Sequence, residues 1–126
     1  MPRNKLISII DDDDVVRKAI ARLIKSLGYK VQAFPSAVAF LKSPCVQDTA
    51  CLITDIQMPH MTGVELHSHL VKSGQPIPTI LITAYLDESV RTRVLANGVV
   101  CYLIKPFAAD TLFACVRTAL ERADPR

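Results

Sequence analysis

The chain has 126 residues and a mass of 13.9 kDa, a size that fits one ordinary domain. Half of its residues are hydrophobic and 21% are charged, so the chain can bury a core and is not disordered. Its apolar runs are all shorter than the roughly 20 residues of a membrane span, and we expect no signal peptide at its start. Composition therefore excludes a disordered or membrane-spanning protein.

The formal net charge is +3 and the isoelectric point is about 8.8. The basic residues are scattered singly, with no dense run and no interleaved aromatic residues. This pattern is more typical of a solvated surface than of a nucleic-acid interface, so we expect no direct contact with nucleic acid. Four consecutive acids, Asp11 to Asp14, stand in the otherwise basic amino-terminal third and are the stronger functional candidate.

The four cysteines have neither the spacing of a metal site nor that of a disulfide framework. They are Cys45, Cys51, Cys101 and Cys115. Three of them lie in or beside apolar runs, where a reduced cysteine behaves as a small hydrophobic residue. The sequence therefore predicts a soluble, reduced, cytoplasmic protein.

Five apolar runs rich in β-branched residues predict five strands, at residues 6–10, 30–34, 50–54, 79–83 and 99–104. Four of these runs are nearly continuous, as strands are when helices cover both faces of a sheet. The second run alternates between apolar and polar residues, which predicts an edge strand.

The segments between the strands have helical spacing. Two of them carry an apolar stripe, formed by Val16, Ile20, Leu23, Ile24 and Leu27 in one case and by Leu112, Val116, Ala119, Leu120 and Ala123 in the other. Glycines at 28, 74 and 98 mark helix ends, and Ser36 and Asp87 are candidate N-caps. The fourth helix, at about 87–97, has the weakest stripe, so its surface is available for something other than core packing.

Strict alternation of strands and helices implies parallel strands joined by right-handed crossovers. We predict one α/β domain over residues 1–126, with a polar tail at about 122–126. Its core is a doubly wound five-stranded parallel sheet with five helices. The flavodoxin-like strand order 2-1-3-4-5 would place the topological switch point between the first and third strands.

Ligands of a doubly wound sheet bind at the carboxyl ends of its strands. The residues that follow or end those strands here are Asp11, Asp12, Asp55, Thr83 and Lys105. Three carboxylates at one edge repel one another unless a cation neutralises them, and Mg²⁺ prefers such oxygen ligands. With a lysine suited to a phosphoryl oxygen, this set favours phosphoryl transfer, in which Asp55 is a candidate nucleophile.

Four pieces of the sequence, in order, carry a family resemblance. They are Ile-Ile-Asp-Asp-Asp at 9–13, Thr-Asp-Ile-Gln-Met-Pro at 54–59 followed by Met-Thr-Gly at 61–63, Ile-Thr-Ala at 82–84 and Lys-Pro-Phe at 105–107. The chain resembles the receiver domain of two-component response regulators over essentially its whole length. Within that family it looks most like receivers that precede a helix-turn-helix output domain of the LuxR type.

The resemblance implies that Asp55 is the phosphoacceptor and attacks a phosphohistidine on a sensor histidine kinase. It implies that Mg²⁺ is bound directly by Asp12 and Asp55, through water by Asp11, and by the backbone carbonyl of Gln57. Lys105 would pair with the phosphoryl group, and the bond from Lys105 to the next proline would be cis.

The resemblance also implies a switch, in which Thr83 bonds the phosphoryl group and Tyr102 turns inward. The face made by the fourth helix, fifth strand and fifth helix would then change, and we expect phosphorylation-dependent dimerisation through it. A C-terminal DNA-binding output domain outside this chain is a further expected partner. The chain departs from the family in being basic, and Gln57 and Tyr85 occupy positions that vary among receivers.

Two other functions stay open. One is a receiver-like interaction domain that phosphate does not regulate. The other is a Mg²⁺-dependent phosphohydrolase, which generally needs a second acid two residues after the nucleophile, where this chain has Gln57. We expect no enzyme activity beyond self-catalysed phosphoryl transfer and slow autodephosphorylation. Asp13 and Asp14 are expected only to start a helix, and His60, His67 and His69 are not expected to form a metal site.

Overall fold

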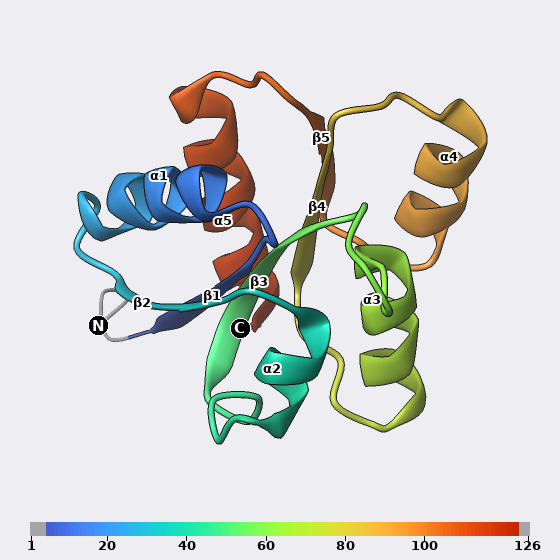
Figure 1. Cartoon of the computed structure of the whole chain (residues 1–126), viewed down its shortest axis with the longest axis horizontal. Helices are drawn as coiled ribbons and strands as arrows, with labels where there is room; N and C mark the ends of the chain where they lie inside the picture. Colours follow the sequence, from blue (N-terminus) through green and yellow to red (C-terminus); the bar gives the residue numbers. More distant parts are fainter. Residues whose placement is uncertain (1–4, 124–126) are drawn as a thin grey trace.

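The computed structural model describes residues 5–123, in which five parallel strands alternate with five helices (Figure 1). The elements are β1 (Leu6–Ile10), α1 (Asp14–Lys25), β2 (Lys30–Phe34), α2 (Ala37–Lys42), β3 (Thr49–Asp55), α3 (Gly63–Lys72), β4 (Thr79–Thr83), α4 (Glu88–Ala96), β5 (Cys101–Ile104) and α5 (Ala109–Ala123). The predicted fold class is confirmed. No helix in the described part of the chain is long and apolar enough to cross a membrane.

The strand order is β2-β1-β3-β4-β5, as predicted, and every neighbouring pair is parallel. The alternating strand β2 pairs only with β1, so it is an edge strand. Chain order reverses between β1 and β3, and the carboxyl ends of these two strands are where a doubly wound sheet binds its ligands.

Helices cover both faces of the sheet: α1 and α5 lie on one face, and α2, α3 and α4 lie on the other (Figure 1). Side chains along each inner strand alternate between the two layers. In β1, Ile7 and Ile9 pack with the α1 and α5 layer, whereas Ile10 packs with α2 and α3. This double burial explains why the inner strands are apolar at nearly every position.

Local capping explains where the helices begin and end. Ser36 caps α2 by accepting the Ala39 N–H, and Asp87 caps α4 by accepting two backbone N–H groups, so both predicted N-caps are confirmed. The predicted stops Gly28, Gly74 and Gly98 all have φ between 78° and 99°, a left-handed conformation that glycine adopts without steric cost.

Helix α4 is the least buried of the longer helices, as its weak apolar stripe predicts. Val94 is its only buried residue. The chain that leads into it exposes two large side chains, Tyr85 and Leu86. The α4 surface is therefore not consumed by core packing.

Three sequence expectations need correction. The predicted fifth strand begins at 101 rather than 99, because the N–H of Val99 bonds to the last turn of α4. The predicted third strand, at 50–54, is one residue too short at each end, since Thr49 already pairs with β1 and Asp55 still pairs with β4. Helix α5 continues to Ala123, and residues 124–126 of the predicted polar tail lie outside the described residues.

The third correction concerns the cysteines, because Cys101 and Cys115 form a disulfide instead of remaining reduced. Their spacing in the sequence matches no framework because the pairing arises from packing, where α5 lies across β5 with the two Cα atoms 6.2 Å apart. Cys45 and Cys51 are free, as expected.

Candidate functional site

The carboxyl ends of the inner strands place the predicted site residues at one edge of the sheet. Asp11 directly follows β1, Asp55 ends β3, Thr83 ends β4 and Lys105 directly follows β5. Adjacent parallel strands end side by side, so these four residues, 94 positions apart at the extremes, lie at the same edge of the sheet.

Three carboxylates form the centre of the site. One carboxylate oxygen from each of Asp11, Asp12 and Asp55 lies within 4.8 Å of the others, and no other group of potential metal ligands occurs within residues 5–123. Asp11 and Asp55 are 1% and 6% exposed, whereas Asp12 faces solvent. The predicted cluster is therefore a mostly buried acidic pair with an open side.

The four consecutive aspartates at 11–14 have different roles. Asp13 accepts the backbone N–H groups of Val15 and Val16 and so caps α1, and Asp14 pairs with Arg17 in the first turn. The Asp13 N–H donates to Asp11 Oδ1 at 2.9 Å, which fixes the Asp11 carboxylate in place. The start of the helix thus orients the carboxylate that precedes it.

Lys105 lies between the two buried carboxylates. Its Nζ is 3.4 Å from Asp11 Oδ2 and 3.3 Å from Asp55 Oδ1. Burial lowers the pKa of Lys105, but the charges of Asp11 and Asp55 more than offset this and hold that pKa above its usual value. The peptide bond from Lys105 to Pro106 is cis, as expected.

Asp55 is buried, and Lys105 compensates its charge only in part. Burial raises the pKa of Asp55, Asp11 raises it further, and Lys105 offsets part of the rise. Lys105 Nζ lies at ion-pair distance from Asp55 Oδ1, but this buried oxygen accepts no geometrically formed hydrogen bond. A buried carboxylate oxygen without a donor, beside two further carboxylates, fits a hard divalent cation.

Gly63 lets α3 approach the site. A Cβ atom at this position would lie 2.4 Å from the backbone oxygen of Asp55, far inside van der Waals contact. The Gly63 N–H also donates to the carbonyl of Ile56, the residue after Asp55. The first residue of α3 therefore braces the end of β3 that carries the central carboxylate.

Thr83 is fully buried, and its hydroxyl contacts Gln57. Thr83 Oγ1 donates to the Gln57 side-chain Oε1 at 2.8 Å and accepts the backbone N–H of Tyr85 at 3.1 Å. Sequence reasoning named Gln57 for its backbone carbonyl and as a position that varies among receivers, but it missed this side-chain contact with Thr83. No pattern in the sequence could reveal it, because the two residues are 26 positions apart and meet through a rotamer choice.

Tyr102 connects the same region to α4. Its hydroxyl donates to the carbonyl of Tyr85 and accepts the N–H of Asp87, both at 3.3 Å. Its ring packs in the cluster of Leu81, Val94 and Val99. A chain of hydrogen bonds therefore runs from Gln57 through Thr83 and Tyr85 to the N-cap of α4.

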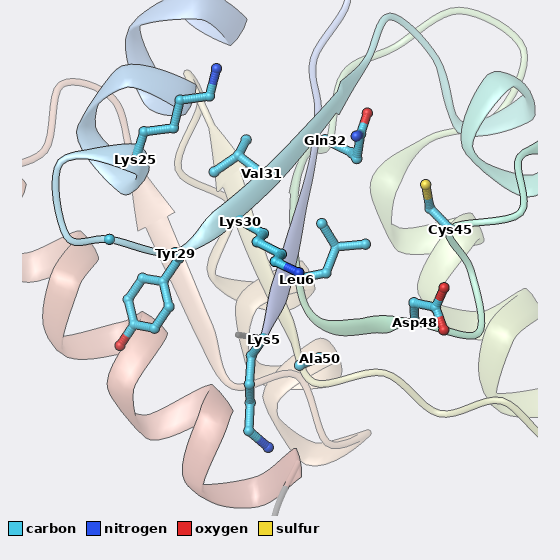
Figure 2. A pocket seen from close by; sticks show the side chains of 11 residues that line it. Lys5, Leu6, Lys25, Tyr29, Lys30, Val31, Gln32, Cys45, Asp48 and Ala50 are labelled. Atoms are coloured by element: carbon cyan, nitrogen blue, oxygen red, sulfur yellow. The ribbon is translucent and has the colours of Figure 1, made fainter. Parts of the chain in front are cut away.

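A surface pocket lies elsewhere, at the amino ends of the strands (Figure 2). It has a volume of about 960 Å³ and is lined by residues that include Lys5, Lys25, Lys30, Cys45 and Asp48. Lys5 and Lys25 point in opposite directions, so the lysines do not converge on one ligand position (Figure 2). The predicted site residues Asp11, Asp55, Thr83 and Lys105 lie at the other edge of the sheet.

The fold and the cluster of three carboxylates beside Lys105 define the class of protein to which the chain belongs. It matches the response regulator receiver domain over residues 7–117 and belongs to that family, the receiver domains of two-component systems. Response regulator protein TmoT of Ectopseudomonas mendocina is 35% identical over 121 residues, which cover 96% of this chain and 55% of TmoT. Transcriptional regulatory protein FixJ of Azorhizobium caulinodans is 35% identical over 123 residues, which cover 98% of this chain and 58% of FixJ.

A solved structure shows the same fold. The crystal structure of FixJ-N has a TM-score of 0.84 and 34% identity with this chain, and the match covers 94% of each. The chain spans little more than half the length of the curated relatives named above. What those longer proteins do as a whole is therefore not shown for this chain by similarity to its receiver part.

Proposed function

We propose that Asp55 is the phosphoacceptor of this receiver domain and takes a phosphoryl group from a sensor histidine kinase. The observation that carries the proposal is the position of Asp55, which is buried beside Asp11 and in ion-pair contact with Lys105 at the carboxyl ends of the strands. An oxygen of the Asp55 carboxylate would bond to phosphorus as the phosphorus–nitrogen bond of the phosphohistidine breaks. The departing imidazole nitrogen keeps that electron pair and takes up a proton from water.

The donor set favours Mg²⁺ as the cofactor. Asp12 and Asp55 would bind it directly, Asp11 through water, and Gln57 through its backbone carbonyl. When bound, the cation neutralises charge that builds up on the transferring phosphoryl oxygens. Lys105, which already carries a stabilised positive charge between Asp11 and Asp55, would move to a phosphoryl oxygen.

Thr83 and Tyr102 would switch an output surface. Thr83 can bond a phosphoryl oxygen only by releasing the Gln57 amide, because a hydroxyl donates one hydrogen. Its movement would disturb the Tyr85 contacts and, through them, the Tyr102 hydroxyl at the start of α4. The face of α4, β5 and α5 would then change, which allows phosphorylation-dependent dimerisation.

A C-terminal DNA-binding domain of the helix-turn-helix, LuxR-type class is the proposed output, so that the whole protein controls transcription. The greater length of the relatives and the fact that FixJ is a transcriptional regulatory protein support this. We place the protein in the cytoplasm, where ATP is the source of the phosphoryl group that the kinase transfers to it. The receiver itself acts as a switch and not as an enzyme that turns over other substrates.

Phosphoryl incorporation from acetyl phosphate tests the assignment. Intact-protein mass spectrometry should show a single Mg²⁺-dependent, hydroxylamine-labile addition on the wild type and none on Asp55→Asn. Asp110→Asn, which changes an exposed aspartate in the first turn of α5, is the matched control and should be phosphorylated like the wild type. Stoichiometric labile addition to Asp55→Asn would overturn the proposal.

A further inference from the structure

The disulfide between Cys101 and Cys115 joins two elements of one layer. Cys101 is the first residue of β5 and Cys115 lies in the middle of α5, 14 residues later. Both side chains belong to the layer between the sheet and the α1 and α5 helices. The next residue, Tyr102, points to the opposite layer, towards α4. The disulfide therefore lies on one face of β5, and Tyr102, whose hydroxyl contacts the α4 N-cap, lies on the opposite face.

The two remaining cysteines differ from this pair. Cys51 is fully buried in β3, and burial raises the pKa of its thiol to about 12, which keeps it protonated and unreactive. Cys45 is partly exposed in the segment between α2 and β3 and is a free thiol. The chain thus carries its own controls, one inert thiol and one accessible thiol without a disulfide partner.

We propose that Cys101 and Cys115 are a reversible thiol–disulfide site that closes by exchange with a low-molecular-weight disulfide such as oxidised glutathione. Disulfides of reducing compartments are seldom permanent and act mainly in redox sensing or catalysis. The compartment assigned above under the proposed function is of this reducing kind. In a reducing compartment, the disulfide between β5 and α5 persists only while an oxidant is present to re-form it.

The exchange balances in two steps. The Cys101 thiolate, at the partly exposed position, attacks one sulfur of the small disulfide and releases one thiolate. Cys115, 7% exposed and already opposite Cys101, then attacks Cys101 Sγ and releases the second small thiolate. Two protein thiols lose two protons and two electrons, and one small disulfide becomes two small thiols.

Closure cross-links β5 to α5, two of the three elements in the proposed output face. By linkage, a cross-link that favours one arrangement of this face alters the phosphorylation equilibrium that moves it. This second consequence rests on the proposed phosphorylation switch, whereas the thiol–disulfide site rests on the geometry of the two cysteines and on the proposed compartment alone.

Alkylation counted by mass spectrometry tests the site. Protein exposed to oxidised glutathione, then denatured and alkylated without reduction, should gain a label on Cys51 and a second on Cys45 wherever Cys45 carries no glutathione adduct, and four labels after reduction. Cys45→Ser should gain one label without reduction and three after it. Four labels on the oxidised wild type, or peptide mapping that links any other pair of cysteines, would overturn the proposal.

The order of attack has its own test. Cys115→Ala should stop at a glutathione adduct on Cys101, and Cys101→Ala should leave Cys115 largely unmodified while the protein remains folded by circular dichroism. Equal adduct formation at Cys115 would overturn the assignment of Cys101 as the entry point. Cys115→Ser serves as a second variant, because it keeps a polar atom of similar size at the buried position.

A last experiment distinguishes failure of the thiol–disulfide site from failure of the proposed function. Phosphoryl incorporation from acetyl phosphate is measured on oxidised and reduced wild type, with Cys101→Ala as the redox-insensitive control. The extent should differ between the two redox forms by about fivefold or more, the lower end of ordinary coupling between sites. Equal extents with the disulfide confirmed would overturn the coupling alone. Absence of any phosphorylation in both forms would count against the proposed function and leave the alkylation result standing.

Discussion

The four consecutive aspartates show how residues of one type take different roles within a single turn of chain. Asp11 is buried and is fixed by the N–H of Asp13, whose own side chain caps α1. Asp12 is exposed and open to a ligand on the solvent side. Asp14 faces solvent and pairs with Arg17. Backbone geometry at the start of α1, and not residue type, separates the site residues from the capping residues.

Asp12 should control divalent-cation binding without affecting the fold. At a Mg²⁺ concentration 100 times the Kd, binding stabilises a protein by about 2.7 kcal/mol, and we expect a gain of this order for the wild type. Asp12→Asn should lose most of that gain. The measurement is the urea midpoint with and without Mg²⁺. Asp14→Asn is the matched control and should keep the gain, since its carboxylate points to Arg17; an equal loss there would contradict the assignment.

His67 should make the protein less stable in acid. Burial on α3 lowers the pKa of His67 below its usual 6.5, so the folded state binds this proton less tightly than the unfolded chain does. As pH falls through 6.5, the unfolded chain gains a proton that the folded state does not, and stability falls until the folded pKa is reached. Lys72 and Arg93 line the same hollow as His67.

Two matched variants isolate this histidine. Urea midpoints between pH 7.5 and 5.5 should fall less for His67→Gln than for the wild type. His69→Gln changes an exposed histidine on the same helix and should follow the wild type. The same pH slope for His67→Gln and the wild type would show that other groups cause the acid sensitivity.

At this scale the sequence predicted the residues that end strands and missed the contacts made by flexible side chains. Asp11, Asp55, Thr83 and Lys105 were predictable because topology alone brings the ends of parallel strands together. The bond from Thr83 to the Gln57 side chain was not, because it depends on how an exposed amide turns.

Among the elements, α3 is the one whose position bears most directly on the site. Its first residue touches the backbone of Asp55, and a capping box between Thr62 and Glu65 fixes where the helix begins. The helix can start this close to β3 only because Gly63 has no side chain. The position of the Asp55 carboxylate therefore depends on a residue with no chemistry of its own.

Gly63→Ala should damage both stability and phosphorylation. The added Cβ would meet the Asp55 backbone oxygen at 2.4 Å, so β3 or α3 must shift, at a typical cost of about 1–3 kcal/mol. The measurements are the urea midpoint and the rate of labelling by acetyl phosphate. Gly74→Ala is the control: its Cβ meets nothing, but its φ of +78° strains alanine, so stability should fall while the labelling rate holds. An unchanged rate in Gly63→Ala would contradict the role of this contact.

The elements themselves follow from patterns that act over a few residues, and their errors come from contacts that do not. Caps at Ser36 and Asp87 and the three glycine stops were predictable from local chemistry. The start of β5 was not, because Val99 keeps its apolar character while its N–H closes the end of α4. The pairing of Cys101 with Cys115 likewise depends on α5 crossing β5.

In the whole molecule, the two layers of helices differ in how much apolar surface they bury. The α1 and α5 layer buries long apolar stripes, whereas α4 buries only Val94 and leaves most of its surface in solvent. Strand order could be predicted because right-handed crossovers leave few alternatives once five alternating units are recognised. The use of the α4 face cannot be read from the same patterns, since they describe only what a helix buries.

Phosphorylation should produce a dimer through the face of α4, β5 and α5, which light scattering can detect with a phosphoryl mimic such as beryllofluoride. Leu95 on α4 is 38% exposed, and Leu95→Asp should abolish the increase in mass, because an unpaired charge opposes burial in an interface. Val38 on α2, across the sheet from α5, is 40% exposed, so Val38→Asp makes the same kind of change at equal exposure and should leave the dimer intact. Loss of the dimer in both variants would place the interface elsewhere. A mass that the mimic does not change in the wild type would mean that the switch acts within one chain.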